Sequence, residues 1–151
     1  MDRHFELTDK FIINAFGAKL FQIKCTRKIK YADIGDLGGY IEKENNLSGN
    51  AWVYGNAWVY GNAQVYGNAQ VSGDAWVSND NEHCGFDCFG SANRHTHSYK
   101  TKSGKIEITC GCFRGSIEEF EKQIKETHRG NEFERQYMAI VEVIKIKFGL
   151  K

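Results

Sequence analysis

Five side chains that can ligate a metal lie close together in the second half of the chain: His83, Cys84, Cys88, His95 and His97. Zinc usually takes four nitrogen or sulfur ligands, supplied as two closely spaced pairs. Cys84 and Cys88 with His95 and His97 form a permissible but loosely spaced set, so they are the zinc candidates of this sequence. The alternative is that the thiols pack in the interior and the imidazoles lie at the surface. We expect this alternative, and therefore no metal and no other cofactor.

Two further groups are of types that could carry chemistry. Cys112 and His128 would make a nucleophile pair, but no third group is evident to orient the imidazole. Ser91 and Arg94, with the backbone amides around them, could hold a phosphate between subunits. The first pattern is too incomplete to predict an enzyme. The second is typical of a protein that sequesters a nucleotide or another small ligand.

Aromatic side chains recur between residues 49 and 78, where they would form a surface for binding another protein. They fill the second and sixth places of a six-residue repeat, which we expect to face outward: Trp52, Tyr54, Trp58, Tyr60, Tyr66 and Trp76. Gln64 and Gln70 fill places of the same kind. Tryptophan and tyrosine dominate the energetic centres of protein interfaces, and soluble monomers rarely expose ladders of them. The alternative is that these rings lie beneath the flanking segments or against another copy of the chain.

The repeat predicts the architecture that would position these rings. Leu47 and then a valine every six residues up to Val77 fill its first place, while alanine fills the fifth place and glycine the third. Valine suits a buried pleated surface, alanine suits a crowded inward position, and glycine before Asn or Asp permits a turn through positive φ. Each unit is therefore a short strand and a corner. A six-residue period favours stacked parallel strands over helices or hairpins.

The stretch from Leu47 to Glu82 resembles the hexapeptide-repeat family, whose fold is a left-handed parallel β-helix with three hexads in each triangular turn. The resemblance implies about two turns, and it puts Trp58 directly beneath Trp76. The open ends of so short a prism need covers. We therefore expect a mainly β protein in three parts: an N-terminal β cap (1–40), the left-handed β-helix (41–82) and a C-terminal α+β module (83–151).

Many hexapeptide-repeat proteins are acyl-CoA-dependent transferases. The resemblance would imply a trimer, a general-base histidine at the subunit interface and a coenzyme slot between neighbouring prisms. The repeat from Leu47 to Ser78 contains no histidine and no inserted loop, and two turns offer little wall for a long cofactor. An acyltransferase-like protein therefore stays an alternative, and we expect no enzymatic activity.

The N-terminal segment predicts two strands on either side of a turn at Gly17, with a period-2 pattern along residues 21–25. Its basic residues fit a solvated strand face better than a binding patch. Ile41 lies one hexad before Leu47 and is in phase with it. The lead-in "LGGYIEKENNLSGNAWV" resembles uncharacterised phage and prophage proteins in which this segment opens a run of hexapeptides.

The C-terminal segment predicts a hairpin followed by two helices, a ββαα unit. The hairpin turn falls at residues 102–105, before an apolar strand face that ends at Cys110 and Cys112. Ser116 and Glu119 form a capping box at the start of the first helix, and Asn131 begins the second. The buried faces of the two helices are predicted from their apolar stripes: Ile117, Phe120 and Ile124, then Tyr137, Ile140, Val141, Ile144 and Phe148.

The same segment resembles a second uncharacterised phage domain that is often found behind hexapeptide repeats. The residues that carry this resemblance come from three stretches: Gly90, Ser91 and Arg94; Gly111, Cys112, Phe113 and Gly115; Thr127 and His128. His95 and His97 depart from the threonines more usual there. No established activity of that domain carries over to this chain.

Composition narrows the function further. The net charge of +1 and the absence of a basic segment argue against nucleic-acid binding, and no apolar run approaches the length of a membrane span. We expect a protein of the host-cell cytoplasm with reduced thiols. The resemblances and the aromatic surface together predict a non-enzymatic phage protein that forms a homo-oligomer and binds a host protein, such as a CRISPR–Cas effector, as an inhibitor of host defence.

Overall fold

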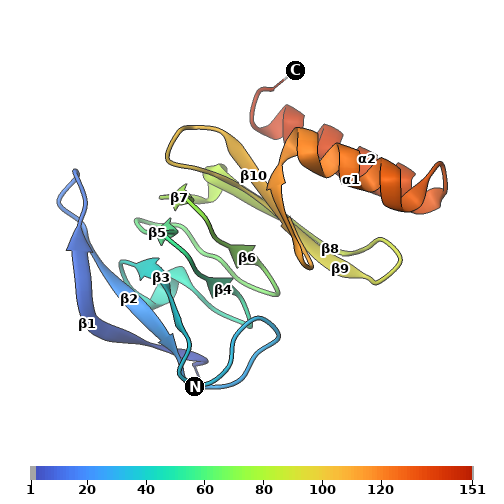
Figure 1. Cartoon of the computed structure of the whole chain (residues 1–151). Helices are drawn as coiled ribbons and strands as arrows, with labels where there is room; N and C mark the ends of the chain where they lie inside the picture. The colour runs from blue at the N-terminus through green and yellow to red at the C-terminus, as the bar shows by residue number, and fades with distance from the viewer. Residues whose placement is uncertain (1–2, 151) are drawn as a thin grey trace.

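The computed structural model describes residues 3–150 and shows a mainly β chain with two helices (Figure 1). The predicted outer limits of the terminal parts, residues 1 and 151, lie outside the described residues. The N-terminal strands are β1 (Phe5–Ile13), β2 (Lys19–Cys25) and β3 (Leu37–Ile41). The repeat contributes η1 (Glu44–Asn46), β4 (Trp52–Val53), β5 (Trp58–Val59), β6 (Gln70–Val71), β7 (Trp76–Val77) and η2 (Asp80–Glu82). The C-terminal part comprises β8 (His83–Phe89), β9 (Arg94–Lys100), β10 (Ile106–Cys110), β11 (Phe113–Ser116), α1 (Ile117–His128) and α2 (Glu132–Lys147).

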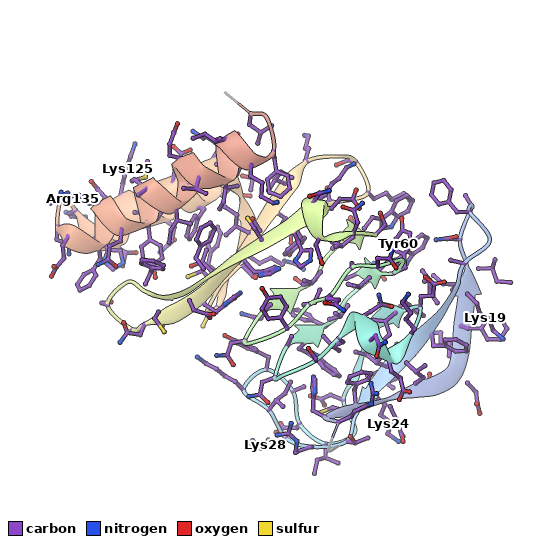
Figure 2. The ribbon with its side chains drawn as sticks, turned by 180° about the vertical axis from the view of Figure 1, so that it is seen from behind. Lys19, Lys24, Lys28, Tyr60, Lys125 and Arg135 are labelled. Atoms are coloured by element: carbon purple, nitrogen blue, oxygen red, sulfur yellow. The ribbon has the colours of Figure 1, made fainter. Side chains whose placement is uncertain are left out.

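The N-terminal hairpin extends one side of the repeat. β1 and β2 pair antiparallel around a turn at Gly17, whose φ is +84°, so the predicted turn is confirmed. β2 then pairs antiparallel with β3, and β3 pairs in parallel with β5, with Ile41 opposite Val59. Lys24 and Lys28 extend from the outside of this segment (Figure 2) and are exposed, as a solvated face requires.

Residues eighteen positions apart pair in parallel throughout the repeat. Trp58 pairs with Trp76 and Val59 with Val77, while Trp52 pairs with Gln70. A third pairing is a single bridge between Leu47 and Val65. Three hexads therefore separate each strand from its partner. The strands are so short because each hexad spends half its length on the corner.

The predicted inward positions form the core of this region. The five valines of the first place are fully buried, as are the five alanines of the fifth place, none of which is more than 1 % exposed. The corners need glycine. Gly49, for example, has φ +63°, and a Cβ atom there would lie 2.8 Å from the backbone nitrogen of Gly67 on the paired corner. Close stacking of backbone on backbone thus explains the strict spacing of the repeat.

The C-terminal sheet has four antiparallel strands in the order β11-β10-β9-β8, so the prediction of two strands is wrong. The hairpin around residues 102–105 is correct and corresponds to β9 and β10. Sequence reasoning missed β8 because most of its residues are exposed and its alternate residues Cys84 and Phe86 are only half-buried. It missed β11 because this strand is only four residues long.

The two helices pack on the face of this sheet that is turned away from the repeat (Figure 1). The capping box of α1 is confirmed: the Ser116 side chain accepts a hydrogen bond from the Glu119 amide, and the Glu119 carboxylate accepts one from the Ser116 amide. Asn131 caps α2 through the amides of Phe133 and Glu134. The predicted apolar stripes are buried, except that Phe148 is only half-buried.

Polar contacts join the C-terminal sheet to the repeat. The Gln70 amide donates to the carbonyl of Gly111 over 3.0 Å, and the Thr109 hydroxyl donates to the carbonyl of Gln70 over 2.8 Å. The fully buried Tyr99 of β9 packs into the core of the repeat and bonds to Ser72. No helix among residues 3–150 is long and apolar enough to cross a membrane.

Candidate functional site

A cavity of about 490 Å³ lies between the end of the C-terminal sheet and the two helices. Most of its lining comes from β9, the β10–β11 turn and α1: Arg94, Cys110, Cys112, Phe113, Arg114, Phe120, Gln123, Ile124, Thr127, His128 and Tyr137. We call it the C-terminal cavity. Its volume lies in the range typical of small-molecule binding sites. Five of its lining residues belong to the motif that carries the resemblance to an uncharacterised phage domain: Arg94, Cys112, Phe113, Thr127 and His128.

Three glycines of the same motif make room for side chains of the cavity. A Cβ atom at Gly90 would lie 2.0 Å from the Tyr137 hydroxyl, and one at Gly111 would lie 2.6 Å from a terminal nitrogen of Arg94. A Cβ atom at Gly115 would lie 3.0 Å from the ring of Phe113. Real Cβ atoms essentially never lie within 3.0 Å of a heavy atom beyond the adjacent residues, so a larger residue at Gly90 or Gly111 would have to displace the side chain beside it. The glycines at these positions therefore allow Tyr137, Arg94 and Phe113 to occupy the wall of the cavity.

The charges in the wall favour an anionic ligand. Arg94 and Arg114 contribute two cations, and no aspartate or glutamate is among the lining residues. Arg114 forms a loose ion pair with Glu107 over 3.6 Å. Arg94 is exposed, and none of the ion pairs among residues 3–150 involves it. Its guanidinium group is thus free to bind an oxyanion, for which its planar donors are well suited.

Aromatic rings line the rest of the cavity. The Tyr137 ring stacks on His128, with centroids 5.6 Å apart, and meets Phe120 edge to face at 5.7 Å. Phe113 lies 5.2 Å from Phe120. Burial, reinforced by the Cys110 thiol, raises the pKa of Tyr137, so this side chain remains a neutral phenol in the physiological range. Its hydroxyl donates to the carbonyl of Phe89 over 3.4 Å, which fixes the ring.

Sequence reasoning located only part of this cavity. Of the two phosphate candidates, Arg94 lines the cavity, whereas Ser91 is exposed in the β8–β9 turn and is not among the lining residues. It assigned Phe120 and Tyr137 to the buried helix stripes alone, although both also face the cavity. Cys112 and His128 both line the cavity, but no hydrogen bond joins them within residues 3–150.

Two of the outward-facing places, Trp52 and Gln70, are buried and do not contribute to an exposed surface. Trp52 is only 2 % exposed because the N-terminal segment covers it, with the His4 ring 6.3 Å from the indole. A Cβ atom at Gly38 would lie 2.9 Å from Trp52, so β3 packs directly against this ring. Gln70 is buried under the C-terminal sheet through its bonds to Gly111 and Thr109. The flanking segments therefore cover these two places, as the alternative interpretation stated.

The remaining aromatic places are accessible to different degrees. Trp58 and Trp76 stack as predicted, with centroids 4.6 Å apart and planes 10° from parallel, and both are half-buried. Tyr54 and Tyr60 are also half-buried, and Figure 2 labels Tyr60 near the end of the repeat. Only Tyr66 is largely in solvent, at 67 % exposure. The exposed aromatic surface is thus smaller than the sequence predicts.

The four zinc candidates do not converge on one point. Cys84 bonds to the Ser98 hydroxyl over 3.1 Å, while Cys88 is exposed at an irregularity of β8, where its φ is +68°. The His95 and His97 rings bond to one another over 2.9 Å. Within residues 3–150, no three His, Cys, Asp or Glu side chains are arranged to hold a metal ion. The imidazoles are also not surface groups, because His83 and His97 are buried.

Comparison with known proteins bears on the repeat alone. Residues 63–79 match the family model described as the YdcK beta solenoid repeat. No curated protein and no solved structure matches the chain. This match supports a β-solenoid repeat at residues 63–79, within a mainly β chain that carries two helices.

Proposed function

We propose that this protein is a non-enzymatic binding protein that captures a small anion carrying a flat ring, such as a nucleoside phosphate, in the C-terminal cavity. The observation that carries the proposal is a lining with two arginines, several aromatic rings and no carboxylate. Arg94 would hold the phosphate, since no ion pair within residues 3–150 engages it. The flat ring of the ligand would pack against Phe113 and the aromatic rings beside it.

The test is titration calorimetry with AMP, adenosine and inorganic phosphate. AMP should bind more tightly than either fragment, because only AMP presents both a phosphate and a base. Arg94→Gln should weaken AMP binding by about tenfold or more, the usual effect of losing a charge-assisted hydrogen bond. Arg135→Gln, on the exposed surface of α2 (Figure 2), is the matched control and should leave binding unchanged.

Two results would contradict this proposal. One is that none of the three compounds binds while the circular dichroism spectrum shows a folded protein. The other is that Arg94→Gln and Arg135→Gln weaken binding equally, which would indicate a general effect of charge rather than a site.

Capture of a protein is the second candidate function, and Tyr66 is the observation that favours it. Its ring is 67 % exposed, more than any other aromatic ring of the repeat. We infer a phage origin from the resemblance of the two flanking segments to phage proteins. The partner would then be a bacterial host protein, such as the CRISPR–Cas effector of a host defence system. Affinity capture from host lysate should recover a protein with the wild type and lose it with Tyr66→Ala. Phe16→Ala, an exposed aromatic of the β1–β2 turn, is the control.

The left-handed sense of the coil is also a proposal. Pairing at eighteen residues, together with buried valine and alanine at fixed places, supports the three-sided coil of the hexapeptide-repeat family. An electron-density map of a crystal in which the corners at Gly55, Gly61 and Gly67 are traced would reveal the hand directly. A right-handed trace would contradict it.

A further inference from the structure

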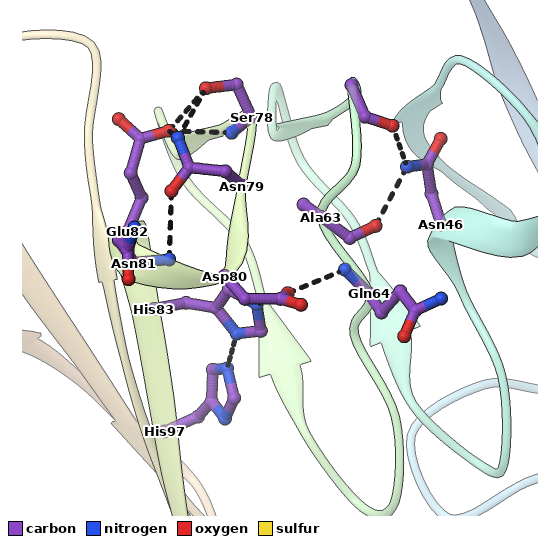
Figure 3. Close-up of polar contacts among 11 residues, drawn as sticks. Asn46, Ala63, Gln64, Ser78, Asn79, Asp80, Asn81, Glu82, His83 and His97 are labelled. Atoms are coloured by element: carbon purple, nitrogen blue, oxygen red, sulfur yellow. Dashed lines mark hydrogen bonds and ion pairs between the residues drawn. The ribbon is translucent and has the colours of Figure 1, made fainter.

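Five side chains near the junction of the repeat and the C-terminal sheet form one continuous hydrogen-bonded row. The Asp80 carboxylate meets Nε2 of His83 at 2.9 Å, and Nδ1 of His83 meets Nε2 of His97 at 3.0 Å. On the other side of His97, Nδ1 meets Nε2 of His95 at 2.9 Å, and Nδ1 of His95 meets the Asp87 carboxylate at 2.5 Å. Figure 3 shows the half of the row from Asp80 to His97.

The three imidazoles are shielded, whereas both carboxylates reach solvent. The side chains of His83 and His95 are 5 % and 7 % exposed, and those of Asp80 and Asp87 are each 61 % exposed. His97 in the centre is buried. Its ring lies 5.2 Å from the His83 ring and 5.1 Å from the His95 ring. The row therefore links two solvent-exposed acids through three shielded imidazoles.

The strand opposite these rings is built to admit them. Gly85 of β8 pairs with His97 of β9, and a Cβ atom at Gly85 would lie 2.6 Å from atoms of both His95 and His97. Gly85 does not have positive φ, so its backbone conformation does not require glycine. The need for glycine comes from the space that the rings occupy.

Counting hydrogens shows that the row needs an additional proton. Four hydrogen bonds require four hydrogens between their donors and acceptors. Three neutral imidazoles supply three, and two ionised carboxylates supply none. A complete row therefore carries one proton more than its neutral histidines and ionised acids provide, with a net charge of −1 instead of −2.

Burial lowers the pKa of His97 well below its ordinary value, and the neighbouring charges of His83 and His95 act in the same direction. The additional proton therefore resides on an outer imidazole, next to a carboxylate. If His83 holds it, His83 donates to His97 and His97 donates to His95. Shifting each of these two hydrogens across its own bond moves the charge to His95 and leaves His97 neutral, with no ring rotation.

We propose that Asp80, His83, His97, His95 and Asp87 form a proton-binding relay, which takes up one shared proton and, when it is bound, latches the β8–β9 hairpin to the end of the repeat. Asp80 supplies the connection to the repeat, because it also accepts a hydrogen bond from the Gln64 amide over 2.9 Å (Figure 3). The hairpin that would be latched carries Gly90 and Arg94 of the C-terminal cavity.

The five residues of the row line a small cavity of about 330 Å³. Groups from the surrounding elements face the same cavity: Tyr66 of the repeat, Cys84 of β8 and Lys147 of α2. Lys147 is the only cation among the lining residues other than histidine, and its charge favours the ionised form of Asp80. Burial raises the pKa of Cys84, so this thiol stays neutral and does not compete for the proton. The imidazoles of the row, rather than Cys84, therefore carry the shared proton.

The first test counts protons on the six ring nitrogens of His83, His95 and His97 by ¹⁵N NMR. Between pH 8 and pH 5 the three rings together should gain one proton, which is shared between His83 and His95, while His97 remains singly protonated. A gain of two or three protons in separate steps, or of none, would overturn the relay. So would a shift of these nitrogens on adding one equivalent of zinc, because that would reveal a metal site.

The second test measures the latch by amide hydrogen exchange, as protection factors corrected for the intrinsic effect of pH. Protection of the β8–β9 hairpin should fall about tenfold from pH 5.5 to pH 8, as expected for the loss of one charge-assisted bond. Gly85→Ala should abolish this pH dependence without removing a titrating group, and His97→Gln should do the same if the alanine variant unfolds. Cys88→Ser, in the same hairpin, should behave like the wild type.

Each outcome of the second test is decisive. Persistence of the pH dependence in either Gly85→Ala or His97→Gln would show that the row does not cause it and would overturn the proposal. Loss of the dependence in Cys88→Ser would do so too, because Cys88 is outside the row. Ligand binding in the C-terminal cavity is not required for either measurement, so the failure of one proposal would be distinct from the failure of the other.

Discussion

His4 is a buried imidazole that connects the N-terminal segment to the repeat. Its Nε2–H donates to the carbonyl of Ala51 over 2.6 Å, and its ring packs near Phe5 and Trp52. It is 2 % exposed, and burial lowers its pKa, with Arg27 contributing in the same direction. The hydrogen bond to Ala51 opposes this shift but does not reverse it. His4 is therefore held in its neutral form in the folded protein.

We predict that His4 makes the protein less stable in mild acid. The unfolded chain takes up a proton on His4 below its ordinary pKa of about 6.5, whereas the folded protein does not until a lower pH. The contribution of His4 to the free energy of unfolding is therefore fully present above about pH 6.5. Below that pH, the free energy of unfolding falls by up to about 1.4 kcal/mol per pH unit. Urea unfolding at pH 7.5 and pH 5.5 should show a larger loss for the wild type than for His4→Gln. Equal losses would contradict the prediction.

Trp52 and Trp58 illustrate why residue environments are harder to predict than the repeat itself. Both follow Asn-Ala and precede Val-Tyr-Gly-Asn, so their local sequences are the same. Trp52 is buried because His4 and Gly38, distant in sequence, lie against it, whereas Trp58 is half-buried and stacks on Trp76. The period determines which side of the strand a ring occupies. Only the packing of the flanking segments determines whether that side is covered.

At the scale of the elements, the stability of the repeat depends on its valine positions. Val65 is fully buried where the single bridge to Leu47 closes one side of the coil. We predict that Val65→Ala lowers the free energy of unfolding by about 2–3 kcal/mol, the transfer and cavity cost of a buried aliphatic side chain. Val143→Ala, on the 49 % exposed outer surface of α2, should change it by less than about 0.5 kcal/mol.

Urea unfolding at constant pH would measure both variants. A similar small effect of the two substitutions would mean that the coil interior is not the core of the molecule. That result would also remove the physical reason for valine at every sixth residue.

The success of sequence reasoning differed between elements for a physical reason. The capping box at Ser116 and the stripe along α1 were predictable because a helix carries its own start signal and period. β8 was not, since its alternate residues Cys84 and Phe86 are only half-buried under α2. The sequence singled out Arg94 as part of a phosphate site between subunits, but it did not predict the C-terminal cavity that Arg94 and Tyr137 line. A tyrosine within a helical stripe gives no sign that one edge of its ring meets a cavity.

At the scale of the whole molecule, the repeat and the C-terminal module share a core residue. Tyr99 belongs to β9, yet its fully buried ring packs with the valines and alanines of the repeat. Its hydroxyl donates to Glu107 over 2.7 Å and also meets Ser72 at 3.3 Å. Neither part can lose its fold without uncovering this ring.

We predict that the chain unfolds in one cooperative transition. All three tryptophans lie in the repeat and both α-helices lie in the C-terminal module, so fluorescence and far-ultraviolet circular dichroism report on different parts. The two signals should give the same urea midpoint, the standard criterion for two-state behaviour. Separate midpoints would show that the parts are independent domains. Tyr99→Phe should keep the midpoints together, since it retains the ring.

Pairing at a distance of eighteen residues has a consequence for how such a chain can change in length. A duplication or deletion of eighteen residues within the tract returns every later side chain to its original face, so both ends meet the surfaces that they already fit. A change of six residues also preserves the order of valine, alanine and glycine, but it breaks the eighteen-residue pairing, and in the proposed three-sided coil it would rotate everything downstream by one side. Gln70 would then turn away from Gly111 and Thr109. We therefore expect the folded structure to accommodate insertions and deletions of eighteen residues in this region, but not those of a single hexad.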